Sequence, residues 1–215
     1  MKSIYRIDAA AGRLTDSQGR RFDTASRRWL EERKLEEHDF APGGGEPVGA
    51  QAAVCWLQRQ SGAPLRTPIG VIGPRDATPV QMEASRRIGA GLARMGLTVI
   101  CGGRHGVMEA VARGASDAGG ISIGLLPDAT TEHANPYLTH VIATGIGEAR
   151  NALIARAAFC LVVIGDSYGT LSEVALGLQF GKRVFGLEGA ARIDGVEHCR
   201  DPDEVLEAVA LHVLG

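Results

Sequence analysis

Four glycine-bearing turns in this chain carry the residue types that bind an anion. Each turn follows an apolar run and leads into a segment with a helical pattern, so backbone N–H groups and the positive end of a helix dipole point out of the turn. Glycine lets a ligand approach the backbone closely and permits positive φ. The pattern predicts a phosphate-binding site, although any single turn of this kind could be a simple chain reversal. The turns are at residues 73–79, 102–106, 144–151 and 165–170.

Both favourable and unfavourable groups lie in these turns. Asp166 places a negative charge beside the predicted phosphate, and like charges at about 4 Å repel by roughly 1 to 4 kcal/mol. Phosphate affinity should therefore fall unless a metal or Arg150 compensates. The amide of Asn151 either contacts the ligand or caps a helix. The predicted ligand-binding residues are Gly73, Pro74, Arg75, Gly102, Gly103, Arg104, Gly106, Gly145, Asn151, Gly165, Asp166, Ser167, Gly169 and Thr170.

Arg150 and Glu173 are the candidates for catalysis. A cation in the first turn of a helix opposes the helix dipole by a few tenths to about 1 kcal/mol, so Arg150 needs an anion, either a phosphate or Glu148. Glu173 has two interpretations. With Thr170 as N-cap, "TLSE" is a capping box. Alternatively, the carboxylate faces the cleft and acts on the ligand as a base.

Several other kinds of site are disfavoured. The first unit opens with neither a P-loop nor a G-x-G-x-x-G, which disfavours an ordinary ATPase or NAD-dependent dehydrogenase. The 6 histidines show no metal-ligand spacing, so no metal site is predicted. Met108, near the start of its helix, is expected to pack in the core.

The segments that position these turns alternate between short apolar runs and helical stretches from residue 67 onward. Such alternation predicts parallel strands joined by crossover helices. The runs at 68–73, 97–101, 121–126 and 159–164 are almost continuously apolar, as expected for strands covered on both faces. We therefore predict an α/β fold with a doubly wound, mostly parallel Rossmann-like sheet, helices on both faces, and ligands beyond the carboxyl ends of the strands.

Residues 1–66 differ in composition and are predicted to form a small N-terminal extension, followed by a Rossmann-like domain over 67–215. The extension is expected to contain a hairpin, a helix over 26–37, a linker around 41–50 and, over 49–60, a short helix, with a strand as the alternative. No functional motif is recognised there. An arm that packs on the main domain or binds a partner remains one interpretation.

Three stretches, "CGGRHGVMEAVARGASDAGG", "GEARN" and "GDSYGTLSEVALGL", resemble the LOG (lonely guy) family, formerly called lysine-decarboxylase-like, within roughly residues 67–190. They resemble its relatives the molybdenum-cofactor carrier proteins more closely, and the DprA/Smf proteins are also related. LOG enzymes carry an Arg-Lys pair followed by P-G-G-x-G-T-x-x-E and hydrolyse nucleoside 5′-monophosphates. The residues that match are Arg150, Gly169, Thr170 and Glu173, while those that depart are Asn151, Gly165, Asp166 and Ser167.

The resemblance implies a binding protein for a phosphate-bearing, nucleotide-like ligand, such as a carrier of the molybdenum cofactor (molybdopterin). In this reading the amide of Asn151 would orient the edge of a pterin or purine. The alternative that the resemblance implies is a phosphoribohydrolase that releases free base and ribose 5-phosphate from a nucleoside monophosphate. Arg150 and Glu173 would be its catalytic pair, and the carboxylate of Glu173 would polarise ribose hydroxyls or activate water at the glycosidic bond. Whether the protein is an enzyme is left open, and no cofactor is required. Lysine decarboxylation is disfavoured, because the only lysines, Lys2, Lys34 and Lys182, lie outside the strand-end turns.

Composition restricts the partners. The net charge of −2 and the lack of an uninterrupted basic cluster argue against nucleic acid. No apolar stretch approaches 18 residues and no signal peptide is recognised, so we expect a cytoplasmic protein that does not bind membranes. The 4 scattered cysteines suggest reduced thiols. The related families imply a homodimer or homotetramer.

Overall fold

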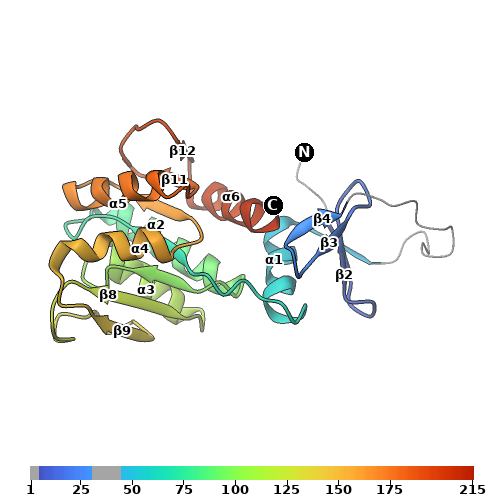
Figure 1. Ribbon diagram of the computed structural model, residues 1–215, viewed down its shortest axis with the longest axis horizontal. Coiled ribbons are helices and arrows are strands. Elements are labelled where there is room, and N and C mark those ends of the chain that lie inside the picture. The colour runs from blue at the N-terminus through green and yellow to red at the C-terminus, as the bar shows by residue number, and fades with distance from the viewer. Residues whose placement is uncertain (1–4, 31–44) are drawn as a thin grey trace. The chain divides into compact units, whose positions relative to one another are not determined.

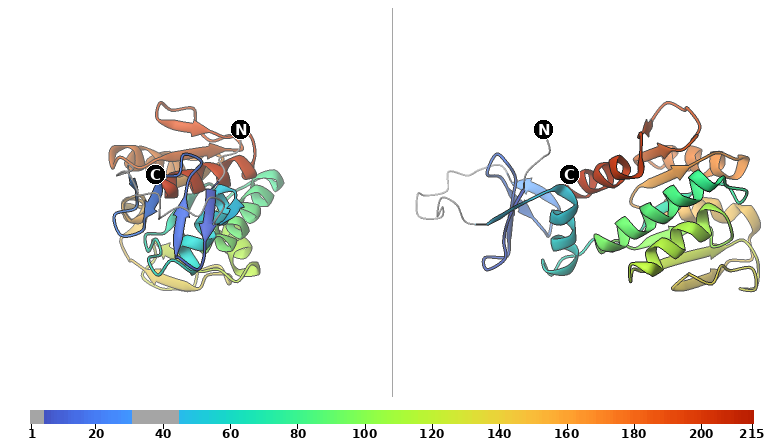
Figure 2. Two further views of the ribbon diagram at one scale, coloured as in Figure 1. Left: turned by 90° about the vertical axis from the view of Figure 1, so that its right-hand side faces the viewer. Right: turned by 180° about the vertical axis from the view of Figure 1, so that it is seen from behind.

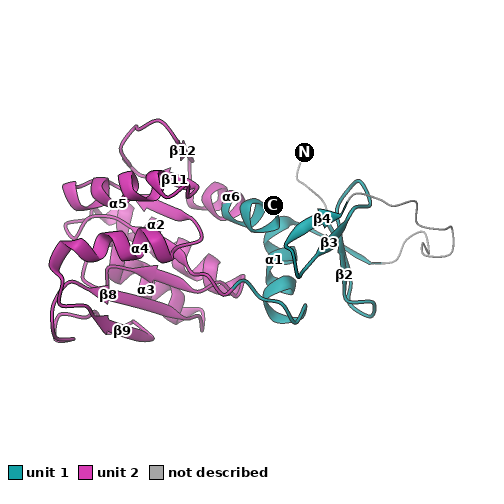
Figure 3. Ribbon diagram, in the orientation of Figure 1, with its two compact units in different colours: residues 1–65, 209–215 teal, residues 66–208 magenta. Residues whose placement is uncertain are grey.

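A computed structural model describes residues 5–30 and 45–215 of the 215-residue chain. The chain forms two compact units (Figure 3). The first comprises Met1–Leu65 and Val209–Gly215, and the second comprises Arg66–Ala208. Within the described ranges, no helix is both long and apolar enough to span a bilayer.

The Arg66–Ala208 unit is built on a seven-stranded sheet in the order β12-β11-β10-β6-β7-β8-β9, with every neighbouring pair parallel. This confirms the predicted α/β, doubly wound Rossmann-like fold. The strands are β6 (Ile69–Ile72), β7 (Val99–Cys101), β8 (Ser122–Leu126), β9 (His140–Ala143), β10 (Leu161–Ile164), β11 (Val184–Leu187) and β12 (Val196–His198).

Helices cover both faces of this sheet. The helices α2 and α3 pack together on one face, and α4 and α5 pack together on the other (Figures 1 and 2). The bounds are α2 (Pro79–Arg94), α3 (Val107–Asp117), α4 (Asn151–Ala157), α5 (Tyr168–Gln179) and α6 (Pro202–Leu214), with a 3-10 turn η1 (Gly147–Arg150) before α4.

The core lies between these layers and explains the apolar runs of the sequence. All residues of β6, β10 and β11 are buried, because helices cover both faces of the strands. Phe185, Leu161 and Ile154 are among the largest fully buried side chains. Burying each contributes roughly 1.5 to 3 kcal/mol relative to exposure. This packing holds the strand ends, and hence the turns, in fixed positions.

Polar side chains mark where the helices α2, α5 and α6 begin. The helix α2 begins with a capping box between Thr78 and Gln81. At α6, Asp201 Oδ1 accepts the N–H of Glu204 at 2.9 Å. The prediction that Thr170 caps α5 is wrong.

The N-cap of α5 is Ser167, whose Oγ accepts the N–H of Thr170 at 3.1 Å. Ser167 is an equally good capping residue that lies earlier in the chain and adopts an extended conformation, so the helix begins at Tyr168. Glu173 is therefore not part of a capping box and must be explained by other contacts.

The first unit contains a five-stranded antiparallel sheet in the order β4-β3-β2-β1-β5, followed in sequence by α1 (Ala50–Arg59). The helix α1 agrees with the short helix predicted over 49–60. The strands are β1 (Tyr5–Asp8), β2 (Arg13–Thr15), β3 (Arg21–Asp23), β4 (Arg28–Leu30) and β5 (Glu46–Val48).

Two local predictions fail in this unit. Residues 28–30, expected to be helical, form β4, because Trp29 lies directly opposite Phe22 on β3 and their rings pack edge to face at 5.0 Å. Residues 46–48, expected in a linker, form β5 and pair with β1. Residues 31–37 of the expected helix and 41–44 of the expected linker lie outside the described residues.

Candidate functional site

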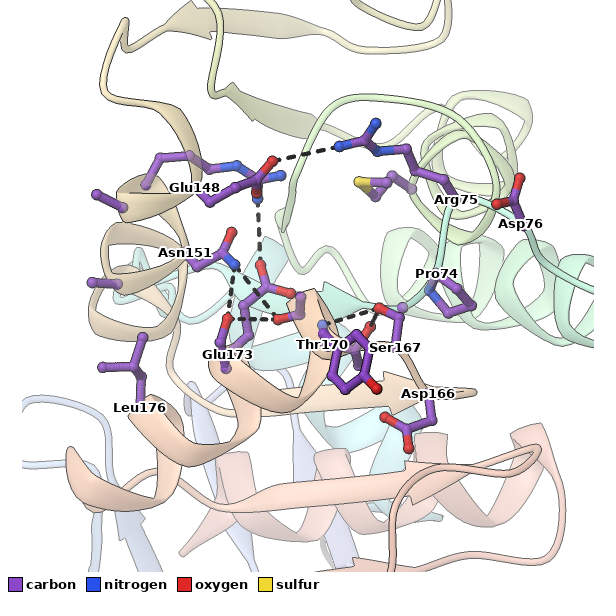
Figure 4. Close-up of a pocket in the computed structure, with 18 residues that line it drawn as sticks. Pro74, Arg75, Asp76, Glu148, Asn151, Asp166, Ser167, Thr170, Glu173 and Leu176 are labelled. Atoms are coloured by element: carbon purple, nitrogen blue, oxygen red, sulfur yellow. Dashed lines mark hydrogen bonds and ion pairs between the residues drawn. The ribbon is translucent and has the colours of Figure 1, made fainter.

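A pocket of about 960 Å³ lies beyond the carboxyl ends of β6 and β10 (Figure 4). These neighbouring strands form the switch point of the sheet, since the chain runs outward from β6 to β9 and then returns to β10 beside β6. The pocket is lined by Gly73, Pro74, Arg75, Asp76, Met108, Glu148, Ala149, Arg150, Asn151, Ala152, Asp166, Ser167, Tyr168, Gly169, Thr170, Ser172, Glu173 and Leu176.

Arg150 is the central cation of this pocket. It ends η1, its exposed fraction is 5%, and its Nη1 donates to Glu173 Oε1 at 3.3 Å. Its Nε is buried and has no hydrogen-bond partner among the described residues. A buried donor without a partner costs about 1 to 3 kcal/mol, and more when it is charged. Arg150 therefore has unsatisfied capacity to bind an anion.

Gly102 makes the position of this guanidinium possible. A Cβ atom at residue 102 would lie 2.5 Å from Arg150 Nη2 and 2.6 Å from Met108 Sδ. Gly102 thus supports the pocket from behind Arg150 and does not itself line it. Met108 is buried, as predicted, but it also lines the pocket.

Glu173 lies on α5, with an exposed fraction of 6%, and its only hydrogen bond to a described side chain is with Arg150. Burial raises the pKa of Glu173 to about 7, with a smaller contribution from the carboxylate of Glu148, while Arg150 acts in the opposite direction. The carboxyl group can therefore gain or lose a proton near neutral pH. It could act as a general base in the pocket.

Arg75 and Glu148 reach toward each other at the pocket from different loops (Figure 4). Arg75 Nη2 lies 3.4 Å from Glu148 Oε1, and both side chains are more than half exposed. The sequence left Glu148 as one possible partner of Arg150. Instead, Glu148 pairs with Arg75, and Arg150 pairs with Glu173. Such an exposed ion pair contributes little to stability and is easily exchanged for a ligand.

Asn151 joins the first turns of α4 and α5 (Figure 4). Its Nδ2 donates to Ser172 Oγ at 2.9 Å, and Ser172 Oγ in turn donates to the carbonyl of Gly169 at 2.7 Å. The amide thus holds the two helices that carry Arg150 and Glu173. This bracing role was not one of the two expected from the sequence.

The start of α5 supplies the backbone donors of the site. Ser167 Oγ occupies the N–H of Thr170, and the N–H groups of Tyr168 and Gly169 belong to the first turn, where no intrahelical acceptor exists. The side-chain hydroxyls of Ser167 and Thr170 also share a hydrogen bond at 2.8 Å. Together with the helix dipole, this turn favours a negatively charged group. Asp166, which is exposed at the same turn, opposes it.

Other predicted residues support the loops behind the pocket. A Cβ atom at Gly106, where φ is +67°, would lie 2.2 Å from the carbonyl oxygen of Arg75. Gly103 packs against Leu126, and Gly165 packs against the side chain of Gln81. None of these three glycines lines the pocket. Because glycine has no side chain, the turns can approach one another closely at these positions.

Arg104 and Gly145 lie away from the pocket residues and are both held by Asp128. Arg104 Nε donates to Asp128 Oδ2 at 3.1 Å, and its Nη2 donates to Oδ1 at 2.5 Å. The N–H of Gly145 donates to the carbonyl of Asp128 at 2.9 Å. Arg104 is thus occupied by a bidentate ion pair, and His133 Nδ1 lies 3.6 Å from the same carboxylate.

Sequence reasoning did not identify Tyr168, Asp76 or Leu176 as pocket residues. Asp76 directly follows Arg75 in a predicted turn, and Tyr168 lies within the quoted "GDSYGT", so their positions were available as signals. Leu176 has no local signal, because only the packing of α4 against α5 brings it to the pocket. Among the described residues, no group of three His, Cys, Asp or Glu could hold a metal ion.

Comparison with known proteins decides the family. The profile of the SLOG cluster4 family matches residues 66–210, about two thirds of the chain. This chain belongs to that family. A protein of Archaeoglobus fulgidus without an assigned function is 37% identical over 138 residues, which cover 64% of this chain and 91% of the relative.

Solved structures of SLOG-like proteins share both fold and sequence with this chain. The molybdenum cofactor binding protein of Rippkaea orientalis is 33% identical, with a TM-score of 0.64 over 67% of this chain and 96% of that one. The molybdenum cofactor carrier protein of Chlamydomonas reinhardtii is 32% identical, with a TM-score of 0.64 over 70% of this chain and 100% of that one. These similarities support a LOG-like ligand-binding protein.

Proposed function

We propose that the pocket binds a phosphate-bearing, nucleotide-like ligand and that this ligand is a molybdopterin-type cofactor, which the protein carries. The observation that carries the proposal is the buried Nε of Arg150, which lacks a partner among the residues described and belongs to a residue that lines the pocket. An anionic group would satisfy it. The ligand class is chosen because the two structural relatives at 33% and 32% identity are named a molybdenum cofactor binding protein and a molybdenum cofactor carrier protein.

Different residues of the pocket would contact different parts of such a ligand. Arg150 and the backbone N–H groups of Tyr168 and Gly169 would bind the phosphate, since a guanidinium and a helix N-terminus both favour an anion. At the exposed side of the pocket, Arg75 would leave its ion pair with Glu148 and bind the ligand instead. If molybdenum is bound to it, such a cofactor would supply a redox-active metal centre to a recipient enzyme, and the carrier itself would catalyse no step.

A second candidate is hydrolysis of a nucleoside 5′-monophosphate, which the buried Glu173 with a pKa near 7 favours. Glu173 as a carboxylate would take a proton from a water molecule that attacks C1′ of the ribose. The bond between C1′ and the base nitrogen would break, and Glu173 would pass the proton taken from water to the leaving base. Arg150 would hold the phosphate.

One experiment tests both candidates. Protein purified without denaturation is unfolded in acid, and the released small molecules are identified by mass spectrometry; a phosphorylated pterin in near-stoichiometric amount is expected. In parallel, the purified protein is incubated with nucleoside monophosphates and assayed for free base. Release of base that is lost in E173Q would replace the carrier proposal with hydrolysis. If no phosphorylated ligand is released and none binds, both candidates fail.

We also propose the compartment, the oligomeric state and the partners of the protein. We expect a cytoplasmic homodimer or homotetramer with a small-molecule partner and neither nucleic acid nor membrane, because the composition and the family resemblance both point that way. Light scattering on the purified chain measures the oligomeric state.

A further inference from the structure

Tyr168 is the most exposed of the large hydrophobic side chains described, with an exposed fraction of 94%. It opens α5 and lines the pocket. In the described parts of the chain, its ring stacks on no other ring and its hydroxyl forms no hydrogen bond. An aromatic side chain with so much exposed area contributes nothing to the core of the unit.

The local structure does not require an aromatic residue at position 168. The cap of α5 is Ser167, and the first helical position needs no bulky side chain. Helix propensity gives no preference for tyrosine either. The presence of this ring beside a pocket therefore calls for an explanation outside the folded unit.

The pocket separates charge from apolar surface. Arg150 and Glu173 are buried and form its charged wall, while Pro74 and Met108 contribute apolar atoms. Tyr168 adds the one aromatic face among the lining residues. A ligand with a phosphate at one end and a flat ring at the other would match both parts.

We propose that Tyr168 is the stacking platform for a planar heterocycle, a pterin or purine, in the ligand whose phosphate Arg150 binds. The inference rests on the proposed function and extends it to the ring of the ligand. Bases stack on aromatic side chains whatever their identity, because every base has a π-face, so this contact selects a flat ring and not one particular base. Tyr168 is thus a positioning residue that separates ring-bearing phosphates from simple sugar phosphates.

The test compares two probes that differ in the ring. Guanosine 5′-monophosphate, whose ring shares its pyrimidine portion with pterins, and ribose 5-phosphate are each measured by equilibrium dialysis with the full chain, and chromatography verifies that the nucleotide stays intact. The wild-type protein should bind the nucleotide about tenfold or more tightly than the sugar phosphate. Y168A should remove this difference by weakening the binding of the nucleotide about tenfold or more.

Two further variants separate stacking from other effects. Y168F retains the ring and should keep the preference, whereas Y168L retains apolar area without a flat π-face and should lose most of it. Far-UV circular dichroism and thermal melting should be the same for Y168A, Y168F and Y168L as for the wild type, because the side chain of Tyr168 is outside the core. R150A should weaken the binding of both probes about equally.

The outcomes are distinguishable. If the wild-type protein binds neither probe, the proposed function fails and this inference fails with it. If both bind equally well, or if Y168A keeps the preference for the nucleotide, the inference alone is overturned. It is also overturned if Y168A changes the oligomeric state while the preference persists, because Tyr168 would then contact a second copy of the chain.

Discussion

The burial of Glu173 should make the free energy of unfolding of the Arg66–Ala208 unit depend on pH. The pKa of this carboxyl group is raised from 4.5 to about 7 in the folded protein, chiefly by burial. Between these two values the folded state holds a proton that the unfolded state has released. Stability is therefore highest below the unfolded pKa, falls as the pH rises from about 4.5 to 7, and is constant above that range.

The size of the effect follows from the two pKa values. They differ by roughly 2.5, and each pKa unit corresponds to about 1.4 kcal/mol, so the ionised Glu173 lowers the free energy of unfolding at pH 8 by about 3 kcal/mol. Replacement by glutamine removes this titration. The difference in stability between the wild type and E173Q should therefore change by about 3 kcal/mol between pH 4 and pH 8, with the variant gaining as pH rises.

Measuring a difference between pH values cancels any constant cost of the substitution, including the lost partner of Arg150. Urea unfolding is followed by far-UV circular dichroism, which reports the helices of this unit. E132Q, which alters an exposed carboxylate that does not line the pocket, serves as the matched variant. A difference between wild type and E173Q that stays flat from pH 4 to pH 8 would refute the reasoning.

Three further predictions concern the support of the site. G102A should weaken binding of guanosine 5′-monophosphate about tenfold or more, because the new Cβ would lie 2.5 Å from Arg150 Nη2; equal affinity in dialysis would contradict this. S167A should lower the free energy of unfolding by about 1 kcal/mol in urea titrations, since it removes the cap of α5, and S167T should restore much of the loss. R104A should lower the melting temperature without changing nucleotide affinity, because Arg104 pairs with Asp128 and does not line the pocket. Weaker nucleotide binding by R104A would show that Arg104 contributes to the site after all.

Where local patterns dominate, the sequence predicted the fold well. Nearly continuous apolar runs predicted strands buried on both faces, and β6 and β10 are such strands. The predictions failed where two local signals competed. Ser167 and Thr170 are both good caps, and only the backbone path out of β10 selects Ser167. Trp29 has a helical context in sequence, but its packing against Phe22 places it in a strand.

The candidate site was predictable in its parts, and its assembly was not. Residue type and spacing identified Arg150 and the turns after β6 and β10 as groups able to bind an anion, and the LOG resemblance singled out Glu173 as a candidate base. That Arg150 faces Glu173 across 23 residues of sequence, with its Nε left unsatisfied, depends on how α4 packs against α5. The tertiary structure alone also decided that Arg104 pairs elsewhere and that Tyr168 is exposed beside the pocket. The physical reason is that capping, glycine conformation and apolar periodicity act over a few residues, whereas burial and the choice of a charged partner depend on which distant surfaces meet.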